Sequence, residues 1–186
     1  MNPLSCNIYY LFHTQFNFTF HMIYLLRHCE SLYNVSCREG KEDDYKEYDS
    51  PLSSHGKESA KKLAHSIIFD MVYVSPLQRC LDTLQFSNIR YKESIILPLI
   101  REMKSHVSDF FKGEDICLEK QDKVLERIST FKKMLEERDK SKNLLIVGHA
   151  DFFWYLTSFV EEDCERFGTW LEYGEFHEFI FLEKAI

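Results

Sequence analysis

Residues 144–149 read Leu-Leu-Ile-Val-Gly-His, an apolar run that ends at a histidine. The run stands between polar residues and is too short for a helix, which is typical of a strand buried on both faces of a parallel sheet. Residues 23–28, Ile-Tyr-Leu-Leu-Arg-His, form a second short apolar run of this kind. The two stretches predict two strands, each of which is followed at once by an imidazole.

Further strands and helices alternate along the chain. Strands are expected at 71–75, 95–100 and 175–182, and Pro98 indicates that the strand at 95–100 is short or lies at an edge. A helix is expected near 54–68, because Ser53 suits an N-cap and apolar residues follow at helical spacing. Other helices are expected after Pro76, near 120–139 and after His149, whereas residues 104–119 look irregular.

This alternation predicts an α/β fold with a mostly parallel central sheet and helices on both faces. The length of 186 residues favours one domain. The first strand begins near Met22, so the domain is expected over residues 22–186. Residues 1–21 show no helical or strand periodicity. They are expected to form an N-terminal extension, or alternatively an extra strand or a packed arm.

The net charge of −7 comes from 23 basic and 30 acidic residues, with no stripe of lysine or arginine. Nucleic acid and membrane surfaces are therefore not expected as partners. No apolar run is long enough to span a bilayer, and residues 1–21 lack the basic segment of a signal peptide. The six cysteines form no CxxC pair and are expected as reduced thiols, which favours a cytoplasmic protein.

Five reactive residues follow the ends of the predicted strands. In open α/β sheets, ligands bind beyond the carboxyl ends of the strands. Arg27 and His28 follow the first strand, Arg79 the second, Glu102 the third and His149 the buried fourth. We therefore expect these side chains to meet at one rim of the sheet.

That set is suited to phosphoryl transfer. A neutral imidazole can attack phosphorus and carry the phosphoryl group covalently, provided that an acceptor on its other nitrogen fixes the tautomer. Arginines bind phosphate oxygens and disfavour protonation of a nearby histidine. A carboxylic acid such as Glu102 could protonate the leaving alkoxide and later activate water. No His/Asp/Glu cluster has the spacing of metal ligands, so neither a metal nor another cofactor is expected.

Five segments, in order, resemble the histidine phosphatase superfamily, the phosphoglycerate mutase-like proteins. Residues 26–34 (LRHCESLYN) resemble its LRHGES..N motif, and residues 49–60 resemble its D.PLT..G..QA segment. Residues 74–80 (VSPLQRC) resemble its SPL.RA turn, residues 100–102 its L.E, and residues 146–150 (IVGHA) its VGHG. The resemblance covers roughly residues 22–182.

The resemblance implies a role for each matching residue. His28 would be the nucleophile and Glu102 the proton donor, while His149, Arg27 and Arg79 would hold the phosphoryl group. Asn34 would be a further phosphate ligand. Two positions depart from the family pattern, because Cys29 and Ala150 replace glycines beside the two histidines. Both keep a backbone N–H, but each adds a Cβ where the backbone would approach the ligand.

The expected activity is that of a histidine acid phosphatase-type phosphomonoesterase. Its partner would be a small phosphorylated substrate or a phosphoprotein; the sequence leaves the oligomeric state open. Only 46 residues separate Glu102 from His149. The family's mutases carry a long insertion in this interval that covers the site, so the short segment favours a phosphatase over a mutase. Two alternatives stay open. One is a weak or inactive pseudoenzyme that binds a phosphorylated ligand, suggested by the two lost glycines, and the other is a phosphomutase.

Overall fold

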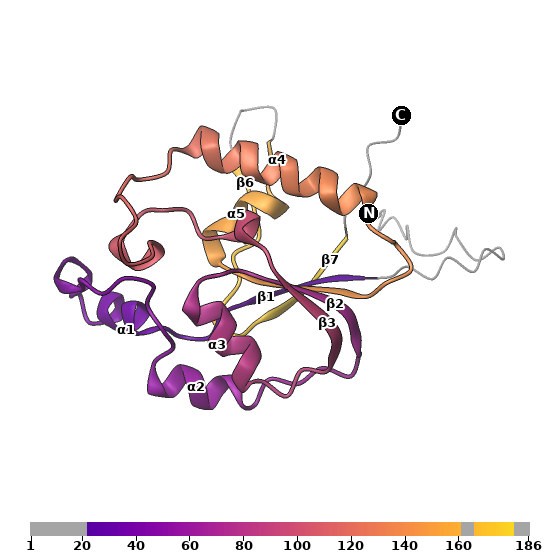
Figure 1. Cartoon of the computed structure of the whole chain (residues 1–186), viewed down its shortest axis with the longest axis horizontal. Coiled ribbons are helices and arrows are strands. Elements are labelled where there is room, and N and C mark those ends of the chain that lie inside the picture. The colour runs from indigo at the N-terminus through magenta and orange to yellow at the C-terminus, as the bar shows by residue number, and fades with distance from the viewer. Residues whose placement is uncertain (1–21, 161–165, 181–186) are drawn as a thin grey trace, which may run out of the picture.

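The computed structural model describes residues 22–160 and 166–180, which form a five-stranded sheet with helices on both faces (Figure 1). The strands are β1 (Ile23–Arg27), β2 (Phe69–Val74), β3 (Tyr91–Ile96), β4 (Leu144–Gly148) and β7 (Phe176–Phe179). Their order is β3-β2-β4-β1-β7, with every neighbouring pair parallel except β1 and β7. The expected α/β fold with a mostly parallel sheet is confirmed.

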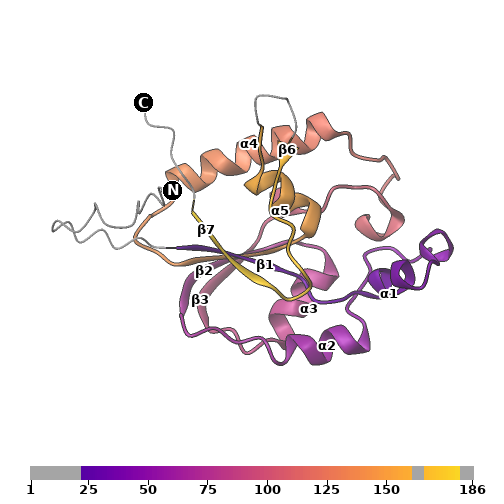
Figure 2. The same ribbon diagram turned by 180° about the vertical axis from the view of Figure 1, so that it is seen from behind.

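Two helices lie on each side of the sheet. Helices α4 (Gln121–Glu137) and α5 (Ala150–Thr157) lie above it in Figure 1, whereas α2 (Ser54–Ala60) and α3 (Gln78–Phe86) lie below. Helix α1 (Leu32–Arg38) lies beyond the sheet, and Figure 2 shows the same layers from behind. A separate pair of short strands, β5 (Phe159–Val160) and β6 (Arg166–Phe167), completes the described elements, apart from 3₁₀ turns at Glu42–Asp44, Pro98–Ile100 and Val107–Asp109.

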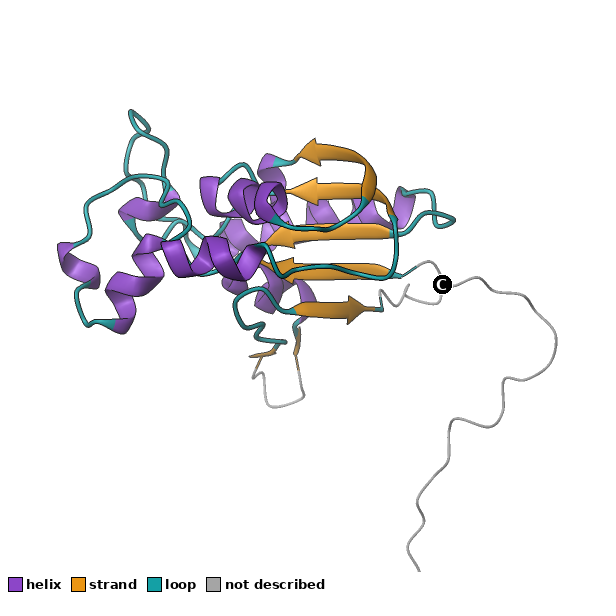
Figure 3. Ribbon diagram, turned by 90° about the horizontal axis from the view of Figure 1, so that it is seen from below, coloured by secondary structure: helices purple, strands orange, loops and turns teal. Residues whose placement is uncertain are grey.

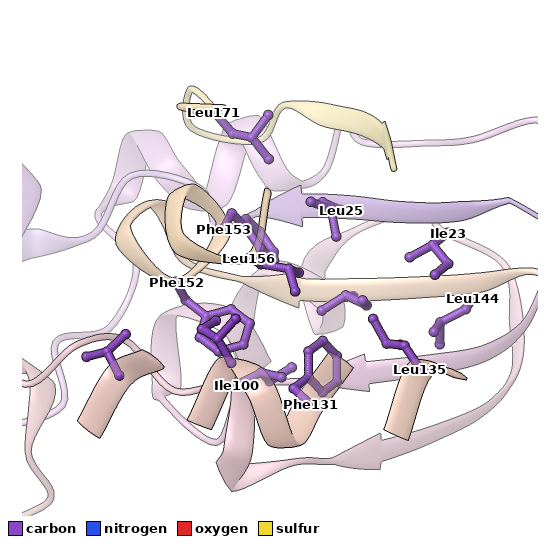
Figure 4. Close-up of a cluster of buried hydrophobic side chains, with 13 residues drawn as sticks. Ile23, Leu25, Ile100, Phe131, Leu135, Leu144, Phe152, Phe153, Leu156 and Leu171 are labelled. Carbon is purple, nitrogen blue, oxygen red and sulfur yellow. The ribbon is translucent and has the colours of Figure 1, made fainter. Parts of the chain in front are cut away.

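The central strands are buried on both faces because their alternate side chains enter two different apolar clusters. Ile23 and Leu25 of β1 belong to the cluster under α4 and α5, which Figure 4 shows. Tyr24 and Leu26 belong to the opposite cluster with Cys80 of α3. This explains why β1 and β4 are continuous apolar runs rather than alternating ones.

The pairing of β1 with β4 sets the carboxyl ends of these strands side by side. Leu25 lies opposite Ile146 and Arg27 opposite Gly148, so the residues after both strands emerge together. Figure 3 shows the four parallel strands pointing to one edge, with β7 running against them. Loops gather beyond that edge, which is where ligands bind in open α/β sheets.

The strand predicted at the apolar run of residues 144–149 is β4 and the helix predicted near 120–139 is α4, but the predicted length of α2 was wrong. The predicted helix at 54–68 ends at Ala60, although Ser53 does cap it by accepting the N–H of Gly56. Beyond Ala60 the chain tightens into a turn, and the Leu63 carbonyl accepts the N–H of Asn88 instead of continuing a helix. Leu63 still packs on the core. The helical spacing of the apolar residues therefore indicated that Leu63 is buried, but it did not indicate that the helix continues to this residue.

The third strand was also misplaced. It spans Tyr91–Ile96 and not 95–100, because Pro98 begins a 3₁₀ turn at Pro98–Ile100. All six residues of β3 are exposed, so no apolar signal marked its start. The expectation that Pro98 marks an edge or short strand is confirmed, since β3 lies at the edge of the sheet. Strand β7 is shorter than predicted, and residues 181–182 lie outside the described residues, as does the extension at 1–21.

Among the helices of residues 22–160 and 166–180, none is both long enough and apolar enough to cross a membrane. Four of the six cysteines lie in this part of the chain and are free: Cys29, Cys37, Cys80 and Cys117.

Candidate active site

The two histidines lie next to each other at the carboxyl edge of the sheet. His28 follows β1, and its backbone N–H donates to the Gly148 carbonyl at 3.0 Å. His149 follows β4 and occupies the N-cap of α5. Their ring centroids are 5.2 Å apart in an edge-to-face arrangement, and both residues are buried. Parallel pairing of β1 with β4 therefore brings the two imidazoles together.

A backbone carbonyl fixes the tautomer of His28. The Nδ1 atom of His28 lies 2.7 Å from the Cys29 carbonyl oxygen. A carbonyl can only accept, so Nδ1 of the neutral ring carries the proton and Nε2 keeps a lone pair. Burial, followed by the charges of Arg79 and Arg27, holds the pKa of His28 well below its usual value. Near neutral pH the ring is uncharged and keeps a lone pair on Nε2.

Arg27 lies against two aromatic rings. Its Nη1 donates to the Leu171 carbonyl at 2.7 Å, and its guanidinium carbon lies 4.1 Å from the ring centre of Tyr173. Trp170 covers it at 5.3 Å. The Nε atom is buried without a hydrogen-bond partner among the described residues. Arg27 thus keeps a donor that a bound anion could use.

Arg79 is held by the segment that follows Glu102. Its Nη1 donates to the Ser108 carbonyl at 3.0 Å and its Nη2 to Oδ1 of Asp109 at 2.8 Å. The other oxygen of Asp109 accepts the backbone N–H groups of Ser105 and His106. The sequence contains no signal for this buried ion pair, because its members are 30 residues apart and Asp109 lies in an unpatterned segment.

Glu102 is a buried carboxyl with a raised pKa. Its Oε1 accepts the N–H groups of Met103 and Phe152 at 3.0 and 3.1 Å, which fixes the carboxyl against the start of α5. Burial, then the negative charges of Asp151 and Asp109, raises the pKa of Glu102 to about 8. The charge of Arg79 and the hydrogen bond from Met103 act in the opposite direction and are outweighed. Below pH 8 the carboxyl therefore keeps its proton.

His149 is neutral and hydrogen-bonded on one side. Its Nε2 lies 2.7 Å from Oγ of Ser75, the residue after β2. The Cys80 sulfur lies 3.4 Å from the same nitrogen. Burial, followed by the charge of Arg79, keeps the pKa of His149 well below its usual value. The sequence placed Ser75 in a motif but did not assign it a partner.

Asn34 makes local contacts. Its Oδ1 accepts from the backbone N–H and the hydroxyl of Ser31 at 3.0 and 2.8 Å, while Ser31 caps the start of α1. These bonds form a capping box, so the amide oxygen of Asn34 stabilises a helix terminus. A role for Asn34 in phosphate binding stays a prediction.

The Cys29 substitution is accommodated behind the site. The side chain lies in a buried apolar cluster with Leu52 and Ala60. Its backbone N–H donates to the Thr83 hydroxyl at 3.0 Å, so this donor is already engaged. Burial raises the pKa of the thiol to about 11, which keeps it protonated at neutral pH. Ala150 is buried as the first residue of α5.

Within the part of the chain that the structure describes, no three His, Cys, Asp or Glu side chains are grouped so that they could hold a metal ion. The site instead consists of two neutral imidazoles, two guanidinium groups and a carboxyl that keeps its proton below pH 8. Such a set can bind an anion and exchange protons with it.

Three of the solved structures that share the fold illustrate the likeness. An alpha-ribazole phosphatase from Shigella flexneri has 17% sequence identity and a TM-score of 0.53, with 81% of this chain and 95% of that chain covered. A phosphoglycerate mutase from Thermus thermophilus has 18% identity and a TM-score of 0.54, covering 83% and 90%. A candidate alpha-ribazole-5'-P phosphatase from Escherichia coli has 21% identity and a TM-score of 0.55, covering 73% and 77%.

A comparison with curated proteins found no match. Residues 23–109 match the model of the histidine phosphatase superfamily, branch 1. The matched range contains Arg27, His28, Arg79 and Glu102, while His149 lies beyond it and enters the site through the pairing of β4 with β1. Residues 23–109, just under half of the chain, therefore resemble the histidine phosphatase superfamily, and the chain as a whole shares the fold of the phosphoglycerate mutase.

Proposed function

We propose that the protein hydrolyses phosphomonoesters through a phosphohistidine on Nε2 of His28. The observation that carries this proposal is the 2.7 Å contact between Nδ1 of His28 and the Cys29 carbonyl. It leaves the Nε2 lone pair free on a ring whose pKa is lowered by burial and by two arginines. A neutral, oriented imidazole beside guanidinium groups is what attack on phosphorus requires.

The first step transfers the phosphoryl group to the enzyme. Nε2 of His28 forms a bond to phosphorus while the bond from phosphorus to the ester oxygen breaks. Glu102, protonated below pH 8, gives its proton to the departing alkoxide. Arg27 and Arg79 stabilise the negative charge on the phosphoryl oxygens.

The second step regenerates the enzyme. The Glu102 carboxylate takes a proton from water, and the water oxygen bonds to phosphorus. The bond between phosphorus and Nε2 then breaks, which releases inorganic phosphate and returns the lone pair to His28. Glu102 is again protonated, so one substrate and one water give one alcohol and one phosphate.

Hydrolysis is favoured over mutase chemistry by the segment between Glu102 and α4. A mutase must exclude water from the phosphohistidine while its intermediate reorients. Here residues 110–120 contain exposed positions such as Lys112, Gly113 and Ile116 and no regular element. An open segment of this kind favours water as the acceptor.

A second candidate is a protein that binds a phosphorylated ligand with little or no turnover. It is favoured because two hydrogen-bond donors that would bind a phosphate already donate to groups of the protein. Arg79 is bonded to Ser108 and Asp109, and the Cys29 N–H is bonded to Thr83. Substrate is in either case expected to be a small phosphorylated molecule or a phosphoprotein.

The test is trapping of the covalent intermediate. The purified protein is mixed with ³²P-labelled phosphomonoesters in the presence of a chelator and quenched in alkali, in which a phosphoramidate survives. We expect a label that is lost in acid and absent from His28→Ala. His55→Ala, which removes an exposed imidazole, is the matched control and should label normally.

Three outcomes decide between the candidates. Label that passes to free phosphate supports the phosphatase, whereas label in a product isomer means a mutase. Absence of label with a broad set of phosphomonoesters, together with binding of one of them, favours the binding protein. Full metal-free turnover by His28→Ala would overturn the phosphohistidine mechanism itself.

A further inference from the structure

The structure places Ser75 as the direct partner of His149. Ser75 is fully buried at the end of β2, and its backbone N–H donates to the Val147 carbonyl of β4 at 3.0 Å. Its Oγ lies 2.7 Å from Nε2 of His149. Sheet pairing thus fixes the serine backbone relative to the strand that carries the histidine.

The hydrogen bonds around the Ser75 hydroxyl indicate which way its proton points. Its Oγ also accepts the Leu77 N–H at 3.4 Å, while the Cys80 thiol donates to the Gly148 carbonyl at 3.5 Å. If Nε2 of His149 donated as well, the serine proton would be left with the Cys80 sulfur, a weak acceptor. If the Ser75 hydroxyl instead donates to Nε2, that nitrogen accepts a hydrogen bond. The Ser75 hydroxyl, the Leu77 N–H and the Cys80 thiol then each have a hydrogen-bond partner.

The second arrangement places the remaining imidazole proton on Nδ1. The ring is neutral, so only one of its nitrogens carries a proton. Nε2 is occupied by Ser75 at 2.7 Å, whereas the contact of Nδ1 among the described residues is the Cys80 sulfur at 3.9 Å, so Nδ1 is the nitrogen able to serve a ligand. A phosphoryl oxygen only accepts hydrogen bonds, so a bare Nδ1 would repel it and a protonated Nδ1 would bind it.

We propose that Ser75 is a positioning residue that holds neutral His149 in the Nδ1–H tautomer, so that this ring donates to the phosphoryl group transferred to His28. The proposal rests on the proposed function for the identity of the bound group. The tautomer itself is a property of the free protein. Its test therefore does not depend on catalysis.

The experiment is long-range ¹H–¹⁵N correlation spectroscopy of the full chain labelled with ¹⁵N-histidine. We expect the His149 pattern of a protonated Nδ1 and a bare Nε2 at neutral pH, with assignment by His149→Gln. In Ser75→Ala the signals should shift toward the Nε2–H form or the average of both, and Ser75→Thr should restore them. Ser50→Ala removes an equally buried hydroxyl bonded to Tyr33 and Tyr45, and it should leave the His149 signals unchanged.

Kinetics provide the second measurement. Loss of the serine donor should lower kcat about tenfold, as expected for one lost hydrogen bond, with a smaller change in KM. A neutral His149 in the Nε2–H form in the unmodified protein would overturn the proposal, and so would an unchanged spectrum in Ser75→Ala. If the spectra behave as expected but no phosphohistidine forms on His28, the proposed function fails and the tautomer assignment stands.

Discussion

Two regions meet at the site and are held in different ways. The ends of β1 and β4, which carry His28 and His149, stand on strands whose every residue is buried. Residues 101–120 on the other side contain one 3₁₀ turn and are held by carboxylates that accept several N–H groups each. Asp109 and Glu114 are examples. His28 is therefore positioned by packing, whereas Glu102 and Asp109 are positioned by polar contacts.

The two regions differ in what they contribute to the molecule, which is apolar burial on one side and charged groups near Glu102 on the other. Apolar packing fixes where the strands end, and the burial that it produces is the largest cause of the pKa shifts of His28, His149 and Glu102. The carboxylates of residues 101–120 contribute less burial, yet Asp109 is one of the groups that raise the pKa of Glu102. Substitutions on the two sides should accordingly differ in whether they affect stability or the pH profile.

The largest effect is expected at Glu102. Glu102→Gln cannot donate the proton to a leaving group, so kcat for alkyl phosphates should fall on the order of 100-fold or more. Nitrophenyl phosphate needs little protonation and should lose less. A raised pKa of about 8 means that the acid form is lost above pH 8, so the alkaline limb of the native profile lies there. Steady-state rates over a range of roughly pH 5–10 for both substrate classes test this, and an equal loss for both would assign Glu102 to binding or structure.

On the packed side, Leu145→Ala should reduce stability strongly. Leu145 is fully buried in the centre of β4, and removal of such a side chain costs about 2–5 kcal/mol of unfolding free energy. The control is Ile116→Ala on the polar side, where the residue is 57% exposed and the expected change is within about 0.5 kcal/mol. Urea unfolding followed by circular dichroism measures both. Equal losses for the two variants would contradict the division between the regions.

Asp109→Asn should change both properties. Losing the charge partner of buried Arg79 should lower the unfolding free energy by about 1–3 kcal/mol. The same change removes a negative charge near Glu102, so the pKa of Glu102 should fall and the alkaline limb should move to lower pH. An alkaline limb that stays in place would show that Asp109 does not influence the proton donor.

The smallest effect is expected at Glu114, a partly exposed carboxyl. Hydrogen bonds from Arg101, with a further one from Lys104, lower its pKa to about 2. Because the folded pKa lies below the ordinary value, the stabilisation is present above about pH 4.5 and is lost as the pH falls toward 2. Glu114→Gln should lower the unfolding free energy by no more than about 1 kcal/mol at pH 7. Chemical unfolding at pH 7 and pH 3 should give a smaller difference between the two proteins at pH 3.

The same division explains how much the sequence could predict. Strand β4 and helix α4 were predicted correctly because burial imposes a pattern on the sequence, and α4 buries Val124, Ile128, Phe131 and Leu135 at helical spacing. Placement of His28 and His149 followed from the rule on strand ends. In contrast, exposed strand β3 carries no apolar signal, and the end of α2 depends on a bond to Asn88 that no local pattern encodes.

Polar partners were the hardest to predict. The pairing of Arg79 with Asp109 and of Ser75 with His149 depends on three-dimensional proximity alone. The side chain of Cys29 is buried with Leu52 and Ala60, and the effect of its Cβ on a bound ligand stays a prediction. The candidate roles of His28, Arg27, Glu102 and Asn34 stay predictions until the variants are measured.

The bond between Arg79 and Asp109 has a consequence for the kinetics of turnover. Under the proposed function, a phosphate that binds Arg79 competes with a carboxylate tethered to the same chain. The apparent affinity for any phosphorylated ligand is then the intrinsic affinity multiplied by the fraction of molecules in which the bond between Arg79 and Asp109 is open. Inorganic phosphate lacks the leaving group of the substrate. Its lower apparent affinity is therefore not offset by contacts between a leaving group and the protein. An internal carboxylate of this kind speeds the departure of product, so the enzyme would keep working as phosphate accumulates.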